Sequence, residues 1–230
     1  MNGIVRNMIE KSTLDFLKGL KKNNDRGWFN KHKDEYQAAL ADMEQVVDEM
    51  ILEVGQFDSR VQGLPPKDAL FRIYRDVRFA KNKSPYKEHF GAVIARQGRK
   101  TEDAIYYFHL EPGNSFLAGG VWHPPTKDLH LIRGAIEVRG QGLQKIVNGA
   151  AFKKNFGTLE GDTVKTVPRG YDKEHPQIDL LRHKDLLAIH HLTDKQVLSA
   201  GLVKDEVKMF KAMIPFNDWL NTAMRKELSS

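Results

Sequence analysis

The chain has 230 residues, with 36 Lys and Arg against 30 Asp and Glu, and it contains no Cys. The lack of Cys excludes a disulfide scaffold, a thiolate zinc site and a cysteine nucleophile. With 40% hydrophobic residues, a chain of this length can bury roughly 70% of its unfolded surface without a structural metal or disulfide. The net charge of +6 is a modest bias toward an anionic partner.

The N-terminal segment lacks the apolar run of an exported protein. Charges at Arg6, Glu10 and Asp15 leave no apolar core for a signal peptide. No stretch of the chain approaches the ~20 apolar residues of a membrane span. We therefore expect a cytoplasmic protein that does not enter a membrane.

Two amphipathic helices are predicted near the N-terminus. Ser12 and Asp15 resemble a capping box for the first helix, which ends near the turn at 23–25. Trp28 is either an anchor at the start of the second helix or part of a ligand wall. The apolar stripes of the two helices predict core packing: Leu14, Leu17 and Leu20, then Phe29, Tyr36, Leu40, Met43, Val47, Met50 and Val54.

The middle of the chain changes to extended patterns after the turn at 63–66. The runs that predict strands are 71–75, 90–95, 105–110 and 116–122. The turn at 111–114 predicts an antiparallel hairpin, and hence a meander whose central strand is 105–110, which is apolar on both faces. Gly119 and Gly120 lack the helix context of a dinucleotide fingerprint and predict a bulge or a close backbone approach.

Helical periodicity returns after residue 126. A helix over 129–147 is interrupted at 140–142, and 157–185 is expected to be a long ordered connector in which 163–167 is a candidate strand. A strand at 186–191 follows. Thr193 and Gln196 form a second capping box, and the last helix begins at 203, breaks at Pro215 and then resumes. These elements predict one α+β domain over residues 1–230, with a largely antiparallel sheet flanked by N-terminal and C-terminal helices.

Residues 71–90 are the most basic part of the chain. Six of these 20 residues are Arg or Lys and two are acidic, a local charge of about +4. Strand geometry would place Arg72, Tyr74 and Asp76 on one face, opposite Arg75. Arg suits bidentate recognition of phosphate or carboxylate groups, and Lys supplies a point charge. The predicted anion-binding residues are Arg72, Arg75, Arg78, Lys83 and Lys87, with Arg182 and Lys184 from the late connector, and the predicted pocket wall is Tyr74, Tyr86 and Trp122.

An Arg–Asp network is the structural alternative for this segment. Asp76 and Glu88 would then tie the cations together at a sheet edge, without a ligand. No catalytic motif is present, so the catalytic residues are unknown, and Asp76 and His175 are only candidates for an acid or base. Either interpretation makes this segment the electropositive centre of the chain.

No metal site and no cofactor is predicted. The histidines show no His-x-His or His-Glu-x-x-His spacing, although a site through Asp76 or Glu111 stays open. His109 lies on an apolar strand face, which favours a hydrogen-bonded core residue over a general base.

Several segments match a known family pattern in order along the chain. They are Phe16-Leu17, Asn23-Asn24 and Trp28-Phe29; 71–76 and 83–87; Gly119-Gly120 with Trp122 and Pro124; and 168–171 with His175-Pro176 and 181–184. The chain therefore resembles the uncharacterised family called domain of unknown function 2461, found in bacteria and fungi. The resemblance covers a core over about 12–200 and implies no established activity. The helical pattern predicts that C-terminal helices at 203–228 follow this core. Val77 and Ala80 stand where the family pattern has Thr and Ser, which weakens any claim for a required hydroxyl there.

Three functions fit these observations. The leading hypothesis is a small-molecule site, which could be enzymatic, for a phosphorylated or carboxylated ligand. A nucleic-acid-binding protein would use the same cations along a phosphate backbone, with exposed aromatic residues stacking on bases. A protein-interaction scaffold without chemistry is the third hypothesis, and a buried, Asp-paired arginine cluster would favour it. The oligomeric state is not predicted.

Overall fold

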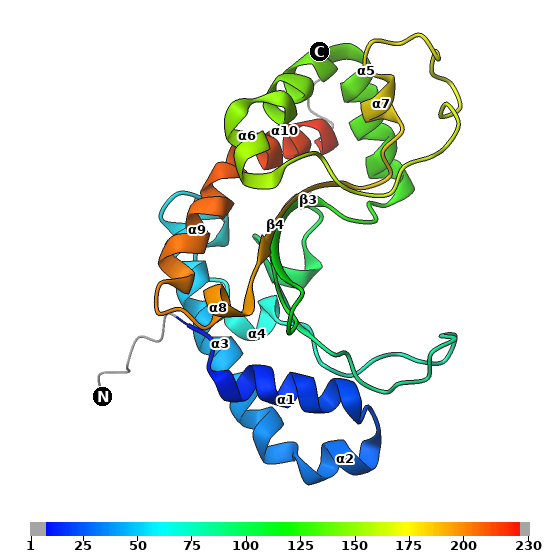
Figure 1. The fold of residues 1–230 in the computed structure, drawn as a ribbon. Coiled ribbons are helices and arrows are strands. Elements are labelled where there is room, and N and C mark those ends of the chain that lie inside the picture. Colours follow the sequence, from blue (N-terminus) through cyan, green and yellow to red (C-terminus); the bar gives the residue numbers. More distant parts are fainter. Residues whose placement is uncertain (1–7, 226–230) are drawn as a thin grey trace. The chain divides into compact units, whose positions relative to one another are not determined.

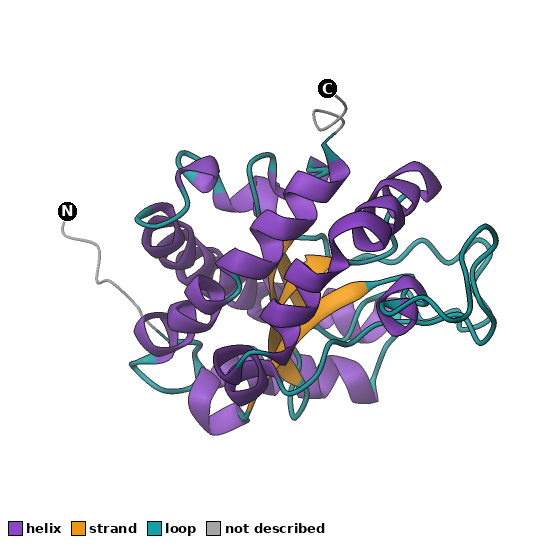
Figure 2. Ribbon diagram, turned by 90° about the horizontal axis from the view of Figure 1, so that it is seen from above, coloured by secondary structure: helices purple, strands orange, loops and turns teal. Residues whose placement is uncertain are grey.

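The computed structural model describes residues 8–225, which form ten α-helices and one four-stranded sheet (Figure 1 and Figure 2). In chain order the elements are α1 (Lys11–Lys22), α2 (Arg26–Lys31), α3 (Lys33–Gly55), a 3₁₀ turn (Ser59–Val61), α4 (Pro66–Ala69), β1 (Phe90–Ile94), a 3₁₀ turn (Gly98–Lys100), β2 (Ile105–Leu110), β3 (Ser115–Val121), α5 (Thr126–Asn148), α6 (Ala150–Phe156), α7 (Ile178–Leu181), β4 (Leu186–Leu192), α8 (Asp194–Val197), α9 (Leu202–Ala212) and α10 (Ile214–Met224). The predicted α+β class is confirmed. No helix in this part of the chain is long and apolar enough to cross a membrane. The predicted helical residues 226–228 lie outside the described residues.

The sheet is an antiparallel meander, as predicted. Its strands pair in the order β1-β2-β3-β4, which places β2 in the interior. The turn between β2 and β3 closes where the Asn114 N–H donates to the Glu111 carbonyl at 2.9 Å, with Gly113 at a φ of 76°. At Gly120, which has a φ of 116°, a Cβ atom would collide with the Leu186 carbonyl, so the predicted close backbone approach is confirmed.

The contacts between Cα atoms divide the chain into two compact units. Unit 1 comprises the residues up to Thr101, Tyr107–Leu117 and His191–Lys208. Unit 2 comprises Glu102–Tyr106, Ala118–His190 and the residues from Met209 onward. The expectation of one domain over 1–230 stays a prediction, and each unit is described by its own contacts.

Helices α1 and α3 pack together in unit 1. The predicted apolar stripe of α1 is buried, as are the α3 residues Met43, Val47, Met50 and Val54. The Asp42 carboxylate of α3 accepts hydrogen bonds from the Glu10 N–H (2.9 Å) and the Thr13 hydroxyl (2.6 Å). The helix begins at Lys11, with Glu10 as its N-cap residue and no side-chain cap, so Ser12 lies inside the helix and the predicted capping box there is wrong.

The predicted long helix over 29–54 is divided at His32 into α2 and α3. The Asp25 carboxylate accepts the Trp28 N–H at 2.9 Å and caps α2. The Trp28 ring lies against Gly19 of α1 and stacks on the His32 ring at 3.9 Å between centroids. These contacts favour the interpretation of Trp28 as a helix anchor.

In unit 2, α5 packs against α7 and α10. The predicted interruption of α5 is a kink at Arg139, where φ is −135°. Pro215 lies in the first turn of α10, where a missing N–H costs no helical hydrogen bond, so the predicted break before α10 is confirmed. The Asn221 side chain accepts the Ala104 N–H at 2.7 Å.

Short elements differ most from the sequence prediction. Helices α4, α6 and α7 have four, seven and four residues, too few to show a helical stripe, and they were not predicted. The strand candidate at 163–167 forms only an isolated bridge between Thr163 and His183.

Candidate functional site

Residues 71–89 form a long loop with two limbs, which we call the arm, between α4 and β1 in unit 1 (Figure 1). The limbs run antiparallel, and the Lys87 N–H donates to the Ile73 carbonyl at 2.7 Å. The Pro85 carbonyl accepts the Arg75 N–H at 2.9 Å, but Pro85 has no N–H to complete the pair of hydrogen bonds at this position. The strand predicted at 71–75 is therefore replaced by isolated bridges.

The side chains of the first limb alternate as the sequence predicted. Ile73 is 1% exposed, whereas Tyr74 is 47% exposed. Arg72 and Asp76 are exposed like Tyr74, and Arg75 is half-buried. The first limb thus presents Arg72 and Tyr74 to solvent.

The return limb is attached to the N-terminal helices. The Asn24 amide donates to the Tyr86 carbonyl and accepts the Tyr86 N–H, both at 3.1 Å, and it also donates to Glu88 at 3.3 Å. The Tyr86 ring is buried and stacks on Phe29 of α2 with centroids 4.0 Å apart. Tyr86, which was predicted in a pocket wall, therefore packs into an aromatic cluster.

At the tip of the arm the polar groups are engaged with one another. Arg78 forms an ion pair with Asp76 at 2.7 Å, and its guanidinium lowers the pKa of that carboxyl. Lys83 donates to two carbonyls of the first limb at 3.1 and 3.3 Å, and Arg75 donates to a carbonyl across the arm at 3.1 Å. Phe79, also at the tip, is 97% exposed.

Three cations gather at the base of the arm, and we call Arg72, Lys87 and Arg99 the base cations. The Lys87 ammonium lies 4.8 Å and the Arg99 guanidinium 5.9 Å from the centroid of the Phe71 ring. Burial, followed by the charges of Arg72 and Arg99, lowers the pKa of Lys87. Within residues 8–225 none of the three forms an ion pair with a carboxylate.

Arg99 belongs to the 3₁₀ turn after β1 and was missed by the sequence analysis. Its guanidinium donates to the carbonyls of Asp68 and Lys67, at 3.0 and 3.1 Å, at the end of α4. It also borders a hollow of about 300 Å³, lined by Gln62, Gly63, Leu64, Pro65, Asp68, Arg96, Gln97, Arg99 and Lys100. The signal in the sequence was the run of three cations over 96–100, which extends the basic region beyond residue 90.

The other predicted anion-binding residues belong to unit 2, where each lies near a carboxylate. Arg182 lies 3.4 Å from Asp179, and Lys184 lies 3.5 Å from Asp162. Both residues stay predictions for anion binding.

Trp122 and His175 also belong to unit 2. Trp122 is 67% exposed, with its ring 4.4 Å from that of His123, and it lines a hollow of about 250 Å³. His175 accepts the Gln177 N–H at 3.0 Å, and its other ring nitrogen lies 3.3 Å from the Glu137 carbonyl. Both ring nitrogens of this catalytic candidate are therefore engaged with neighbouring groups.

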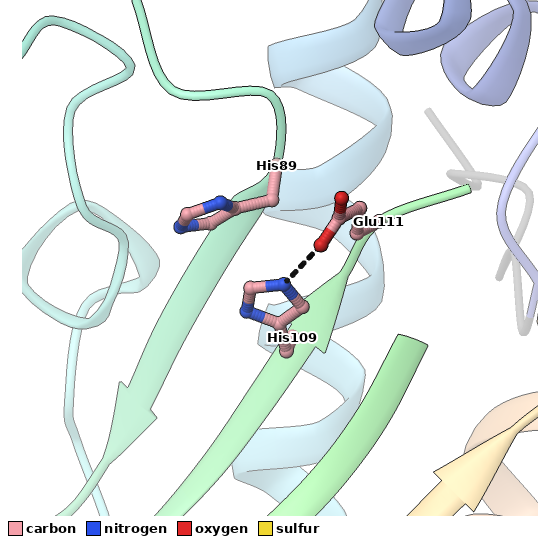
Figure 3. A group of neighbouring side chains, drawn as sticks. All are labelled: His89, His109 and Glu111. Carbon is pink, nitrogen blue, oxygen red and sulfur yellow. Dashed lines mark hydrogen bonds and ion pairs between the residues drawn. The ribbon is translucent and has the colours of Figure 1, made fainter. Parts of the chain in front are cut away.

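A second polar cluster lies where the arm joins β1 (Figure 3). His89 ends the arm, His109 lies on β2 and Glu111 begins the turn after it, and one potential ligand atom from each lies within 4.8 Å of the others. The His109 Nε2 is 3.3 Å from the Glu111 Oε2, and the two imidazole centroids are 4.3 Å apart. His89 makes no hydrogen bond to any described residue.

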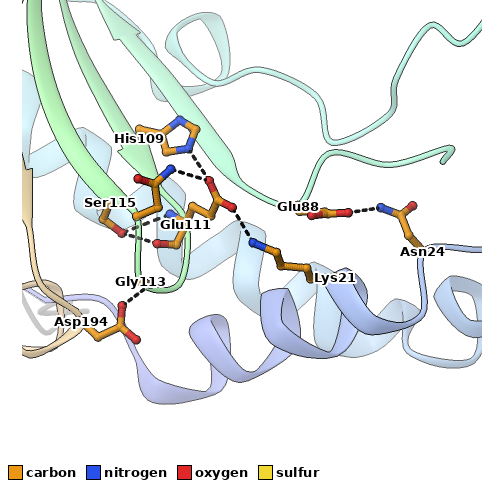
Figure 4. Close-up of polar contacts among 9 residues, drawn as sticks. Lys21, Asn24, Glu88, His109, Glu111, Gly113, Ser115 and Asp194 are labelled. Atoms are coloured by element: carbon orange, nitrogen blue, oxygen red, sulfur yellow. Dashed lines mark hydrogen bonds and ion pairs between the residues drawn. The ribbon is translucent and has the colours of Figure 1, made fainter. Parts of the chain in front are cut away.

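The Glu111 carboxylate is held in place by its neighbours (Figure 4). Lys21 of α1 donates to Oε1 at 3.0 Å, and Asn114 donates to Oε2 at 3.1 Å. Ser115 accepts the backbone N–H of Glu111 at 3.1 Å. Burial alone would raise the pKa of Glu111, but hydrogen bonds from Asn114, Lys21 and His109 lower it to about 2.

Both imidazoles of the cluster are neutral at neutral pH. Burial, with the neighbouring His109 and Lys87, lowers the pKa of His89 to about 4. Burial also lowers the pKa of His109, against the opposing effect of Glu111. His109 is 8% exposed and hydrogen-bonded, so its predicted place in the core is confirmed. Two neutral imidazoles and a carboxylate form a ligand set that the spacing rules applied to the sequence did not detect.

The sequence model of a family of conserved hypothetical proteins, domain of unknown function 2461, matches residues 12–219. Because this match covers most of the chain, the chain belongs to that family, and the resemblance noted from its motifs is confirmed. No curated protein and no solved structure matches the chain.

Proposed function

We propose that this member of the domain of unknown function 2461 family binds a small phosphorylated or carboxylated ligand at the base of its arm. The observation that carries the proposal is the group of base cations. Lys87 and Arg99 lie over the Phe71 ring, the charge of Arg72 acts on Lys87, and none of the three has a carboxylate partner among the described residues. The proposal makes Arg72 and Lys87, two of the predicted anion-binding residues, the centre of the site and adds Arg99.

The energetics of the base cations favour an anionic ligand. A half-buried ammonium beside two guanidinium groups loses hydration and gains repulsion, so the free protein is destabilised by this arrangement. A titratable group whose pKa is lowered by burial and by neighbouring like charges is typical of a functional site. An anion placed among Arg72, Lys87 and Arg99 would offset the repulsion. The Arg72 guanidinium offers paired N–H donors to its oxygens, and Arg99 offers the N–H groups that Asp68 and Lys67 do not accept.

Three other cations of the arm are engaged with groups of the arm itself. Arg78 is paired with Asp76, while Lys83 and Arg75 donate to backbone carbonyls. These contacts fit a structural role in holding the tip, so we place the ligand at the base and not at the tip.

The test is a thermal-shift panel on the full chain at low and moderate salt. The panel contains inorganic phosphate, sugar phosphates, nucleotides, dicarboxylates and short oligonucleotides. A ligand at about 100 times its Kd adds roughly 2.7 kcal/mol to the free energy of unfolding and raises the melting midpoint by about 5–10 °C. We expect a small anion to give this shift in the wild type and in Lys204→Met, an exposed lysine of α9, but not in Lys87→Met.

The outcomes distinguish the candidate functions. Loss of the shift in both lysine variants would mean that the ligand responds to net charge alone, and would overturn the proposal. A shift given only by oligonucleotides that disappears with salt would instead favour nucleic-acid binding. No shift with any compound would favour the protein-interaction scaffold.

A further inference from the structure

We propose that His89, His109 and Glu111 bind one divalent transition-metal ion. They supply two imidazole nitrogens and one carboxylate oxygen from three places in the fold, and the potential ligand atoms lie within 4.8 Å of one another (Figure 3). Imidazole and carboxylate ligands suit zinc and its neighbours in the first transition row, and three protein ligands leave a position open for water or another small ligand. This proposal departs from the sequence-based expectation of no metal site.

The spacing of the ligand atoms fits this coordination after a small adjustment. Zinc bonds of about 2.0–2.2 Å place tetrahedral ligand atoms roughly 3.3–3.6 Å apart. The His109 Nε2 and the Glu111 Oε2 are already 3.3 Å apart. His89 has no hydrogen bond to a described residue, so rotation of its side chain can close the remaining distance without breaking one.

His109 has the partner expected behind a metal-binding imidazole. Its Nδ1 lies 3.1 Å from the Tyr107 hydroxyl, so with Nε2 on the metal the Nδ1–H would donate to that oxygen. The ring of Phe116 stacks on the imidazole at 4.5 Å between centroids and fixes its plane.

Hydrogen bonds from Lys21 and Asn114 already orient the Glu111 carboxylate for metal binding. Lys21 donates a hydrogen bond to Oε1, while Oε2 faces His109 and accepts a further hydrogen bond from Asn114. A metal ion would replace the His109–Glu111 hydrogen bond and leave the Lys21 contact in place (Figure 4).

A hydrogen-bond network without a metal is the competing explanation for Lys21, Glu111 and His109. It does not account for His89, whose half-buried imidazole makes no hydrogen bond within the described chain. The metal proposal gives this side chain a ligand role. It does not depend on anion binding by the base cations, because none of the three metal ligands belongs to that group.

The experiment uses full-length protein without a polyhistidine tag, treated with EDTA and then dialysed. Zn²⁺ binding is measured by calorimetry, and Co²⁺ binding by the visible absorption of a low-symmetry cobalt site. We expect one ion per chain in the wild type. Tyr107→Phe should weaken the affinity about 10-fold through the loss of the outer hydrogen bond, and His89→Ala should weaken it by more than 10-fold.

The controls separate a metal site from a structural network. His191→Ala removes an exposed imidazole of unit 1 whose ring contacts Phe116, and it should bind both ions as the wild type does. His89→Ala is the main variant because its folding, checked by circular dichroism, does not depend on a hydrogen bond of that ring. Absence of stoichiometric metal binding by the wild type, or equal metal binding by His89→Ala, would overturn the metal proposal. The anion-binding test with Lys87→Met is a separate experiment, and its result does not affect this conclusion.

Discussion

Replacing Asn24 by Ala should release the return limb of the arm from the N-terminal helices. The Asn24 amide makes two hydrogen bonds with the backbone of Tyr86 and one with the Glu88 carboxylate, at 3.1 to 3.3 Å. With each such bond contributing about 0.5–1.5 kcal/mol, we expect the free energy of unfolding to fall by about 2–3 kcal/mol. For a chain of this size the melting midpoint should fall by roughly 4–12 °C.

Urea denaturation and hydrogen exchange measure this effect. Asn23→Ala is the matched control, because the Asn23 side chain makes one exposed hydrogen bond, to the Gly19 carbonyl, and should cost less than about 1 kcal/mol. In Asn24→Ala the Tyr86 amide should exchange faster, while amides of α3 respond only to the global loss of stability. Equal stability of the two variants, or unchanged exchange at Tyr86, would refute the reasoning.

Three further changes have defined outcomes. Gly91→Ala places a methyl group against the Tyr107 hydroxyl, and urea denaturation should show a loss of about 1–3 kcal/mol; wild-type stability would contradict this close approach. Because the folded-state pKa of Lys87 lies below 10.5, the unfolded chain holds this proton more tightly, so wild-type stability should rise relative to Lys87→Met as the pH rises toward 10.5. If the difference in free energy of unfolding between the wild type and Lys87→Met stays constant from about pH 8 to about pH 10, the pKa of Lys87 is not lowered in the folded protein. Thr193→Ala removes the capping box of α8 and should lower the free energy of unfolding by about 1 kcal/mol. Thr193→Ser keeps a hydroxyl at this position and should retain most of the stability that the capping box contributes.

The sequence predicted those parts of the fold whose signal is local. The meander follows from period-two strands and the turn at 111–114, and the caps at Thr193 and the break at Pro215 involve neighbouring residues. The start of α1 was mispredicted because the helix begins at Lys11, before Ser12, where Asp42, about 30 residues away, accepts the Glu10 N–H and the Thr13 hydroxyl. A partner so distant in the chain leaves no local pattern.

The candidate sites also depend on residues that are distant in the chain, which local sequence patterns do not reveal. Charge density identified Arg72 and Lys87, but Arg99 joins them only because the 3₁₀ turn after β1 lies beside the arm. His89 approaches His109 and Glu111 across two paired strands, so spacing rules for a single helix or strand do not detect the group. The alternation of exposed and buried side chains in the first limb was predictable, because it depends on strand geometry alone.

The two hydrogen bonds between the Asn24 amide and the backbone of Tyr86 determine where the arm can change in length. They fix the backbone of the return limb immediately before Lys87 and His89. Insertion or deletion of one residue within 86–89 would displace Lys87 from the Phe71 ring and His89 from His109. Insertions at the exposed tip, over 77–82, would leave the register unchanged, so this is the segment in which the arm can be lengthened or shortened.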